Sequence, residues 1–88
     1  MSYQQKKEAV WKKGKPIFGK NPNLYRKDIF GNIIYKPAYG RHSPMGWEID
    51  HKNPQSKGGS DHLNNLQPLQ TFANRSKGNV NIQTKVNW

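Results

Sequence analysis

The chain has 88 residues, with 15 Lys or Arg against five Asp or Glu, for a formal net charge of +10. This length predicts one domain spanning residues 1–88, and a hydrophobic share of 32% allows only a thin core. Without cysteine there are no disulfides or thiolate ligands, so His, Asn, Gln or carboxylate groups would have to hold any metal. No apolar run approaches the length of a transmembrane helix or a secretory signal, so we expect no membrane partner and a cytoplasmic location.

The basic excess indicates a polyanionic partner, most often nucleic acid. A charge that serves only solubility is the alternative. The densest basic region lies in residues 6–27, where a helix could follow a phosphate backbone without reading sequence. No base-reading module is recognisable, so we expect low sequence specificity.

In chain order, residues 3–13 are rich in helix formers, and the glycine and proline that follow predict the end of that helix. Residues 15–24 read as a loop. Residues 24–36 predict a hairpin, because Gly31-Asn32 separates two β-prone runs. Residues 37–46 contain prolines and glycines and predict an irregular connection.

The second half predicts a short strand at 47–49, a long loop at 53–65, a second strand at 66–69 and a helix at 70–77. Gly78 is expected to stop the helix, and residues 80–88 form a C-terminal extension, either an edge strand or a loosely docked segment. A core this small needs its large aromatic side chains inside, and we expect burial of Trp11, Trp47, Phe30 and Phe72.

Polar residues gather around this strand, loop, strand and helix. Asp50 and His51 stand where the first strand gives way to the loop, and Asn74 lies on the helix. Phosphodiester hydrolysis needs a base that works near neutral pH, which His provides, and a hard cation, which carboxylate and amide oxygens hold. Because successive strand residues face opposite ways, we expect the backbone to turn at Asp50-His51, so that Asp50 faces the helix while His51 flanks the site.

The segment IDHKNPQSKGGSDHLNNLQPLQTFANRSKGN resembles the HNH (His-Asn-His) endonucleases, whose core is the ββα-metal fold. The matching elements are Asp50-His51, P-x-S-x-G-G at 54–59, Asn65-Leu66 and the run that begins at Asn74. His51 and Asn65 are fourteen apart, and Asn74 follows nine later. The similarity extends upstream through VWKKGK, LYRKDIFGN and GWEIDH. It implies an α+β fold, with a ββα-metal core at 47–79 preceded by a helix, a loop and a hairpin in residues 1–46.

The resemblance also implies roles. His51 is the general base, and Asn65 braces the loop and helps to orient that base. Asp50 and Asn74 are the metal ligands, with Asn74 in place of the final His of the motif. Oxygen ligands favour Mg²⁺ or Mn²⁺, whereas Ni²⁺ or Zn²⁺ would suit a His-rich variant and are the alternatives.

Other residues are candidates for supporting contacts. The candidates for binding nucleic acid are basic: Arg75, Lys77, Lys52, Lys57, Arg41, Lys12 and Lys13. Arg75 and Lys77 would act either on the scissile phosphate or on the DNA backbone at large. Glu48 shares a strand face with Asp50, and Gln70 shares a helix face with Asn74, so both could support the metal ligands. For Glu48 the alternative is a surface carboxylate paired with a basic side chain.

These features favour a metal-dependent endonuclease that hydrolyses DNA, with double-stranded DNA as the expected substrate and RNA not excluded. One active site cuts one strand, so the enzyme would work as a monomer or a homodimer. One alternative is a nucleic-acid-binding module without turnover. Another is a nuclease toxin or ribonuclease.

Overall fold

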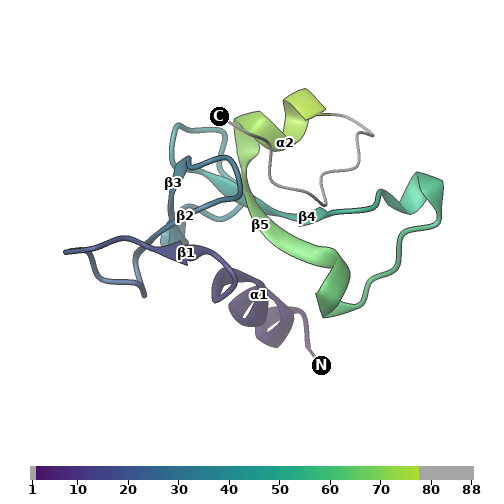
Figure 1. The fold of residues 1–88 in the computed structure, drawn as a ribbon, viewed down its shortest axis with the longest axis horizontal. Helices are drawn as coiled ribbons and strands as arrows, with labels where there is room; N and C mark the ends of the chain where they lie inside the picture. Colours follow the sequence, from purple (N-terminus) through teal and green to yellow (C-terminus); the bar gives the residue numbers. More distant parts are fainter. Residues whose placement is uncertain (1, 78–88) are drawn as a thin grey trace.

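A computed structural model describes residues 2–77, so Gly78 and the predicted extension at 80–88 lie outside the described residues. The architecture is α+β, as predicted: two helices and two antiparallel sheets. The regular elements are α1 (Tyr3–Trp11), β1 (Lys15–Pro16), β2 (Tyr25–Lys27), β3 (Ile33–Tyr35), β4 (Trp47–His51), β5 (Leu66–Gln70) and α2 (Thr71–Lys77). Helices α1 and α2 lie on opposite faces of the β4–β5 sheet, and the three-stranded sheet stands to one side (Figure 1).

Helix α1 begins with a capping box. The Gln5 N–H donates to Ser2 Oγ at 3.1 Å, and the Ser2 N–H donates to Gln5 Oε1 at 2.8 Å, so two otherwise unpaired backbone donors are satisfied. The helix was predicted to reach residue 13 but ends at Trp11. Gly14 closes the turn after it, where a Cβ would meet the Arg26 side chain at 3.0 Å.

The predicted hairpin is present as β2 and β3, which pair Arg26 with Ile34. The prediction of a loop at 15–24 was wrong at its start, because Lys15 and Pro16 form β1 and pair with Lys27 and Arg26. Proline lacks the N–H of a ladder and is tolerated here because β1 is an edge strand.

The loop between β2 and β3 is organised by Asp28, which is only 6% exposed. Its Oδ1 accepts the N–H groups of Phe30 at 3.0 Å and Asn32 at 2.8 Å. Its Oδ2 accepts the Asn32 side-chain amide at 3.1 Å and the Gln70 N–H at 2.9 Å. Asp28 therefore ties the hairpin to the end of β5.

The core is built from Val10, Trp11, Ile34, Trp47 and Leu66. The rings of Trp11 and Trp47 pack with their centroids 5.1 Å apart. Each indole N–H finds a backbone carbonyl at 3.0 Å, on Pro22 and Lys36 respectively.

Burial is therefore confirmed for the two predicted core tryptophans. The prediction was wrong for Phe72, which is 42% exposed and stacks near His42 with centroids 5.3 Å apart, and Phe30 is only partly buried.

Strands β4 and β5 pair over five residues, from Trp47 with Gln70 to His51 with Leu66. The first strand was expected to end at 49, with Asp50 and His51 beyond it. Instead both belong to β4, because Asp50 pairs with Gln67 and His51 with Leu66. The expected backbone turn at Asp50-His51 is therefore wrong: both residues belong to a regular strand, whose alternation turns their side chains in opposite directions.

No helix within residues 2–77 is long and apolar enough to cross a membrane.

Candidate active site

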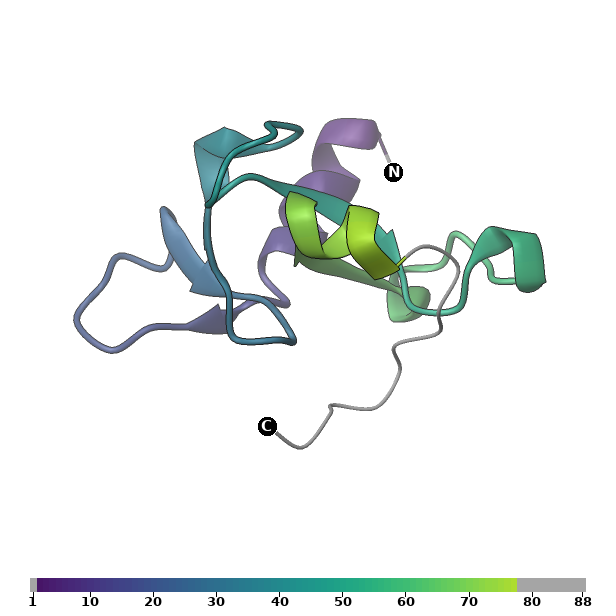
Figure 2. The same ribbon diagram turned by 90° about the horizontal axis from the view of Figure 1, so that it is seen from above.

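Helix α2 lies against β4 because β5 runs into it without a linker (Figure 2). The Thr71 N–H donates to the Gly46 carbonyl at 2.8 Å, which fixes the start of the helix beside the start of β4. Thr71, Asn74 and Lys77 follow one another at a spacing of three and share a face. These residues are buried or partly buried, whereas residues 72, 75 and 76 are exposed. The helix therefore turns a polar face toward the sheet, which explains why Phe72 is outside.

Asp50 is the buried carboxylate of the site, at 3% exposure. Lys77 Nζ lies 2.8 Å from its Oδ1, and the Lys77 side chain is itself only 7% exposed. The Gln67 side-chain amide donates to Oδ2 at 2.8 Å. Within residues 2–77 each carboxylate oxygen thus has one partner, although a carboxylate can accept about four hydrogen bonds.

Asn74 is held from the opposite side by Glu48. Its Nδ2 donates to Glu48 Oε1 at 3.0 Å, and Arg75 completes the contact with Nη2 at 3.0 Å from Oε2. Burial raises the pKa of Glu48, but the hydrogen bonds from Arg75 and Asn74 outweigh it and leave the pKa below its ordinary value. Because the amide nitrogen of Asn74 is engaged with Glu48, its Oδ1 is the end left for other partners.

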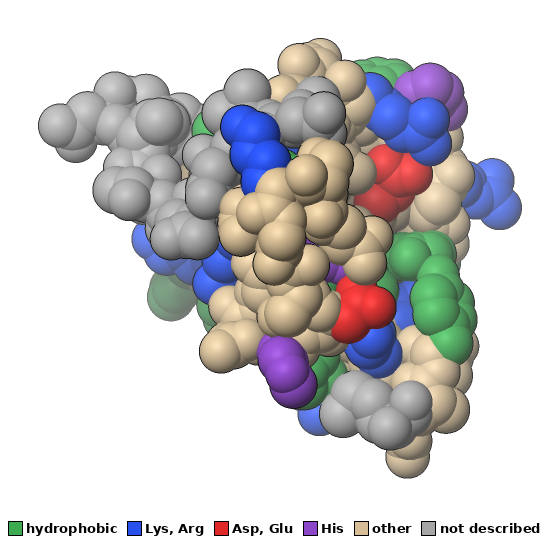
Figure 3. Space-filling model, turned by 90° about the vertical axis from the view of Figure 1, so that its right-hand side faces the viewer, with side chains coloured by type: hydrophobic (Ala, Val, Ile, Leu, Met, Phe, Trp, Pro, Cys, Tyr) green, Lys and Arg blue, Asp and Glu red, His purple; other side chains and the backbone are tan. Residues whose placement is uncertain are grey.

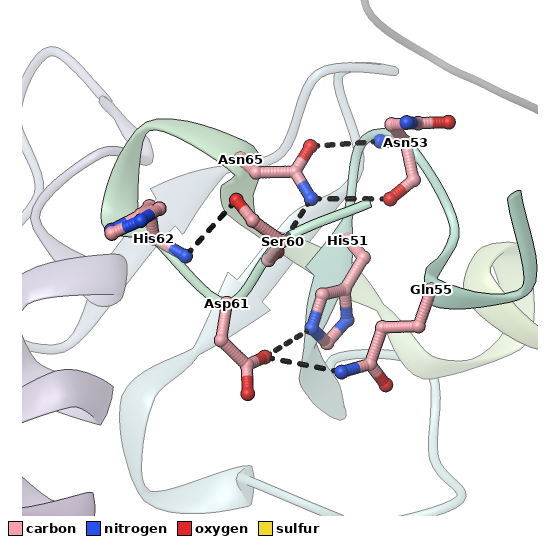
Figure 4. A network of polar contacts seen from close by, with 7 residues as sticks. All are labelled: His51, Asn53, Gln55, Ser60, Asp61, His62 and Asn65. Carbon is pink, nitrogen blue, oxygen red and sulfur yellow. Dashed lines mark hydrogen bonds and ion pairs between the residues drawn. The ribbon is translucent and has the colours of Figure 1, made fainter. Parts of the chain in front are cut away.

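His51 ends β4, and its ring contacts a residue that the sequence did not single out. Nε2 lies 2.6 Å from Oδ1 of Asp61, on the loop between β4 and β5 (Figure 4). The hydrogen bond from His51, and then the charge of Lys6, lower the pKa of Asp61. The only sequence signal for Asp61 is its rarity, as one of five acidic residues, because nothing in the spacing places it beside His51.

Asn65 makes its contacts with the backbone of this same loop (Figure 4). Its Oδ1 accepts the Asn53 N–H at 2.9 Å, while its Nδ2 donates to the carbonyls of Asn53 at 3.1 Å and Ser60 at 2.7 Å. The amide therefore joins the outgoing and the returning parts of the loop. It has no hydrogen bond to His51 itself, so any effect on the base passes through the loop.

A pocket of about 270 Å³ brings four of the predicted residues together, lined by Asp50, His51, Asn74 and Lys77 together with Gln55. Gln70 is not among the lining residues: its amide donates to the Pro44 carbonyl at 2.7 Å. On the face seen in Figure 3, the acidic side chains form two small patches, each beside Lys or Arg side chains. The residues that line the pocket carry a carboxylate, an imidazole, an amide and an ammonium group.

The donor set bears on which metal could bind. In the part of the chain that the structure describes, no three His, Cys, Asp or Glu residues cluster as a metal site. Asp50 and Asn74 offer one carboxylate and one amide oxygen. Mg²⁺ is commonly bound through one or two carboxylates, phosphate oxygens and several waters. The residues present therefore fit a hard, weakly held cation.

The predicted nucleic-acid contacts fall into two groups. Some are already engaged: Arg75 pairs with Glu48, Lys77 pairs with Asp50, and the Lys13 ammonium donates to the carbonyls of Leu63 and Leu66. Burial, and then the charge of Lys52, lower the pKa of Lys13. Lys52 lines a second concave region, with Asn64 and Asn65. The remaining candidates are exposed on the surface: Lys12, Arg41 and Lys57.

Comparison with known families bears on this arrangement. The family model described as HNH endonuclease matches residues 38–79, which include β4, the loop, β5 and α2. Neither the curated proteins nor the solved structures give a significant match. The matched segment carries the pocket and all its lining residues. Residues 38–79 of this chain therefore belong to the HNH endonuclease family.

Proposed function

We propose that this protein is a metal-dependent endonuclease that hydrolyses the phosphodiester bonds of DNA. One observation carries the proposal: a base, a carboxylate and an amide, on His51, Asp50 and Asn74, line one pocket in a strongly basic chain. The family match supports nuclease activity in general. The choice of DNA, of a hard cation and of these residues is our inference from the chemistry of the pocket.

In this mechanism His51 accepts a proton from a water molecule as the water oxygen forms its bond to phosphorus. The bond between phosphorus and the 3′ oxygen breaks, the leaving oxygen takes a proton from solvent, and the products are a 5′-phosphate and a 3′-hydroxyl end. A divalent cation held by Asp50 and Asn74, Mg²⁺ or Mn²⁺ by preference, would supply positive charge at the phosphate and at the leaving oxygen. Glu48 keeps the Asn74 amide oriented, and Lys77 balances the charge of Asp50 before substrate arrives.

The substrate is held mainly by charge. With a net charge of +10 and exposed cations such as Lys12, Arg41 and Lys57, the protein should bind double-stranded DNA with little sequence preference. Binding should weaken steeply as salt rises, because cations released from the DNA carry the driving force. Each active site cuts one strand, so a nicked plasmid is the expected first product.

The test is cleavage of supercoiled plasmid with Mg²⁺, Mn²⁺, Ni²⁺ or Zn²⁺ and with a chelator. His51→Ala should lower the rate by ~10²–10⁴-fold, the usual worth of a general base. His62→Ala is the matched control, because His62 is exposed on the same loop and its hydrogen bonds within residues 2–77 come from its backbone: the N–H donates to Ser60 Oγ and the carbonyl accepts the Asn65 N–H. Cleavage by the His51→Ala variant at the wild-type rate would contradict the role of His51 as the general base.

A second function is favoured by one observation, the neutralisation of Asp50 by Lys77. A carboxylate already paired with an ammonium group is also what a nucleic-acid-binding module without turnover could contain. That reading predicts salt-sensitive binding and no cleavage with any of the four metals. Running the same series on single-stranded RNA separates a ribonuclease or toxin activity from a DNA endonuclease.

A further inference from the structure

The contact between Asp61 and His51 has no counterpart in the roles described so far. The two residues are ten apart in sequence and meet because the loop after β4 returns to it (Figure 4). The distance of 2.6 Å between Oδ1 and Nε2 is short even for a charge-assisted hydrogen bond. Resting on the proposed function, we propose that Asp61 is the positioning residue of the catalytic base, holding the proton of His51 on Nε2 so that Nδ1 is left to accept the proton of water.

The loop is built to place this carboxylate. Ser60, the residue before Asp61, has its carbonyl held by Asn65 Nδ2 at 2.7 Å, and the same nitrogen reaches the carbonyl of Asn53 at 3.1 Å. Gly59 passes so close to the outgoing chain that a Cβ there would lie 1.7 Å from the Asn53 carbonyl oxygen. Only glycine permits this return. The position of Asp61 is thus fixed by the backbone on its N-terminal side.

The chemistry of the two groups decides which ring nitrogen carries the proton. An ionised carboxylate can only accept hydrogen bonds, and a neutral imidazole has one N–H and one acceptor nitrogen. A carboxylate at Nε2 therefore selects the Nε2–H form and leaves the lone pair on Nδ1. The lowered pKa of Asp61 agrees with an ionised carboxylate at neutral pH.

A further contact supports this assignment. Gln55 Nε2 lies 3.4 Å from the same Oδ1, and Gln55 also lines the pocket. Asp61 is thus linked to the pocket through two of the residues that line it. Its side chain is 64% exposed, however, so water competes for the carboxylate. We therefore expect the loss of Asp61 to cost about 10- to 100-fold in cleavage, as for other groups that orient a functional His, and not the full loss expected for His51→Ala.

The direct test is the tautomer of His51, read from ¹⁵N chemical shifts of histidine-labelled protein without metal or DNA. The measurement is made at about pH 8, above the ordinary imidazole pKa of ~6.5. There are three His residues to resolve, and the His51→Ala spectrum assigns the signal. The wild type should show His51 protonated on Nε2, and Asp61→Asn should lose this preference, because an amide can present a donor as well as an acceptor.

The same variants are then compared in plasmid cleavage. Asp61→Asn should lower kcat by about 10- to 100-fold with little change in KM, and Asp61→Glu should restore part of it by returning a carboxylate. Glu8→Gln is the charge-matched control: it also raises the formal net charge by one, from +10 to +11, and Glu8 pairs with Lys36 away from the pocket. Circular dichroism checks that each variant is folded.

The outcomes separate this inference from the proposed function. An unaltered tautomer in Asp61→Asn, or a kcat equal to that of Glu8→Gln, overturns the role of Asp61 while loss of activity in His51→Ala keeps the nuclease assignment. If the wild type cleaves neither DNA nor RNA, the catalytic role of Asp61 falls together with the proposed function. A lost tautomer preference together with a reduced kcat that Asp61→Glu partly restores supports it.

Discussion

Two carboxylates are almost completely buried in this small basic protein, and they are used in different ways. Asp28, at 6% exposure, accepts four N–H donors, two on each oxygen, all from neutral groups. Asp50, at 3% exposure, has one donor on each oxygen, and one of the two is the Lys77 ammonium. A carboxylate accepts about four hydrogen bonds, so among residues 2–77 Asp28 has its full set of donors and Asp50 has two.

The difference follows from what surrounds each carboxylate. Asp28 is enclosed by its own hairpin loop and the end of β5, which supply donors from every side. Asp50 faces a pocket that also contains His51 and Asn74. Both Asp50 oxygens have a partner within residues 2–77, but each can still accept another hydrogen bond or a cation, which fits the metal-ligand role that we propose. We therefore propose that Asp28 serves stability and Asp50 serves the proposed chemistry, and experiments can test each role.

The largest expected effect is on activity, in Asp50→Asn. Removing the negative charge should weaken cation binding and lower plasmid cleavage by ~100-fold or more, since metal stabilisation of a phosphoryl transition state is worth several kcal/mol. Because the amide can accept only one of the two donors and leaves Lys77 without its charge partner, unfolding is measured as well, and cleavage is compared per folded molecule well below each midpoint. Cleavage at the wild-type rate would show that Asp50 is a second structural carboxylate.

Asp28→Asn makes the same substitution at the other buried carboxylate and should lower stability. The introduced NH₂ group would face the donors of Asn32 and Gln70, leaving buried N–H groups unpaired at a cost of ~2–4 kcal/mol. For a domain of this size, the midpoint of thermal unfolding should fall by ~10–20 °C. Cleavage per folded molecule, measured well below that midpoint, should stay near the wild-type value. A folded but inactive variant would contradict the comparison.

The sequence predicted Asp50 but not Asp28, and the reason is physical. The spacing of strand, loop and helix is enough to bring Asp50, His51 and Asn74 together. Asp28 acts on the N–H of Gln70, 42 residues away, and no local pattern encodes that contact. Asp61 was missed for a similar reason, since its place beside His51 depends on how the loop returns.

For helix α2 the sequence-based prediction of the buried face was wrong for a different reason. An amphipathic reading turns Phe72 inward, because apolar residues normally face a sheet. In this helix of seven residues the inward face is instead Thr71, Asn74 and Lys77, and Phe72 is 42% exposed. The site thus takes the helix face that a larger core would have used. Sequence patterns that assume a packed apolar face are least reliable where a short helix lines a polar pocket.

The two carboxylates also differ in charge pairing: Asp50 pairs with the Lys77 ammonium, whereas the donors to Asp28 within residues 2–77 are all neutral. Lys77→Gln should bind Mn²⁺ about 5-fold more tightly in the absence of DNA, since removing an ammonium group close to the proposed metal ligand is worth ~1 kcal/mol. Electron paramagnetic resonance of free Mn²⁺ measures this directly. Lys77→Arg keeps the charge and is the matched control. Equal Mn²⁺ affinity in the wild type and Lys77→Gln would show that the ammonium group does not compete with the cation.

The smallest effect is expected at Glu48. This carboxylate is only partly buried, unlike Asp28 and Asp50, and it is paired with Arg75 and Asn74. Its pKa is below the ordinary value in the folded protein, so its contribution to stability is complete above the unfolded pKa of ~4.3 and is lost as pH falls through the folded pKa. Glu48→Gln should therefore cost ~0.5–1 kcal/mol of unfolding free energy at pH 7, and the difference from the wild type should shrink below about pH 4. Denaturant unfolding in chelator at both pH values measures this, and Arg75→Gln should raise the pKa of the Glu48 carboxyl in a ¹³C titration. A difference that stays constant with pH would contradict the lowering of the Glu48 pKa by Arg75 and Asn74.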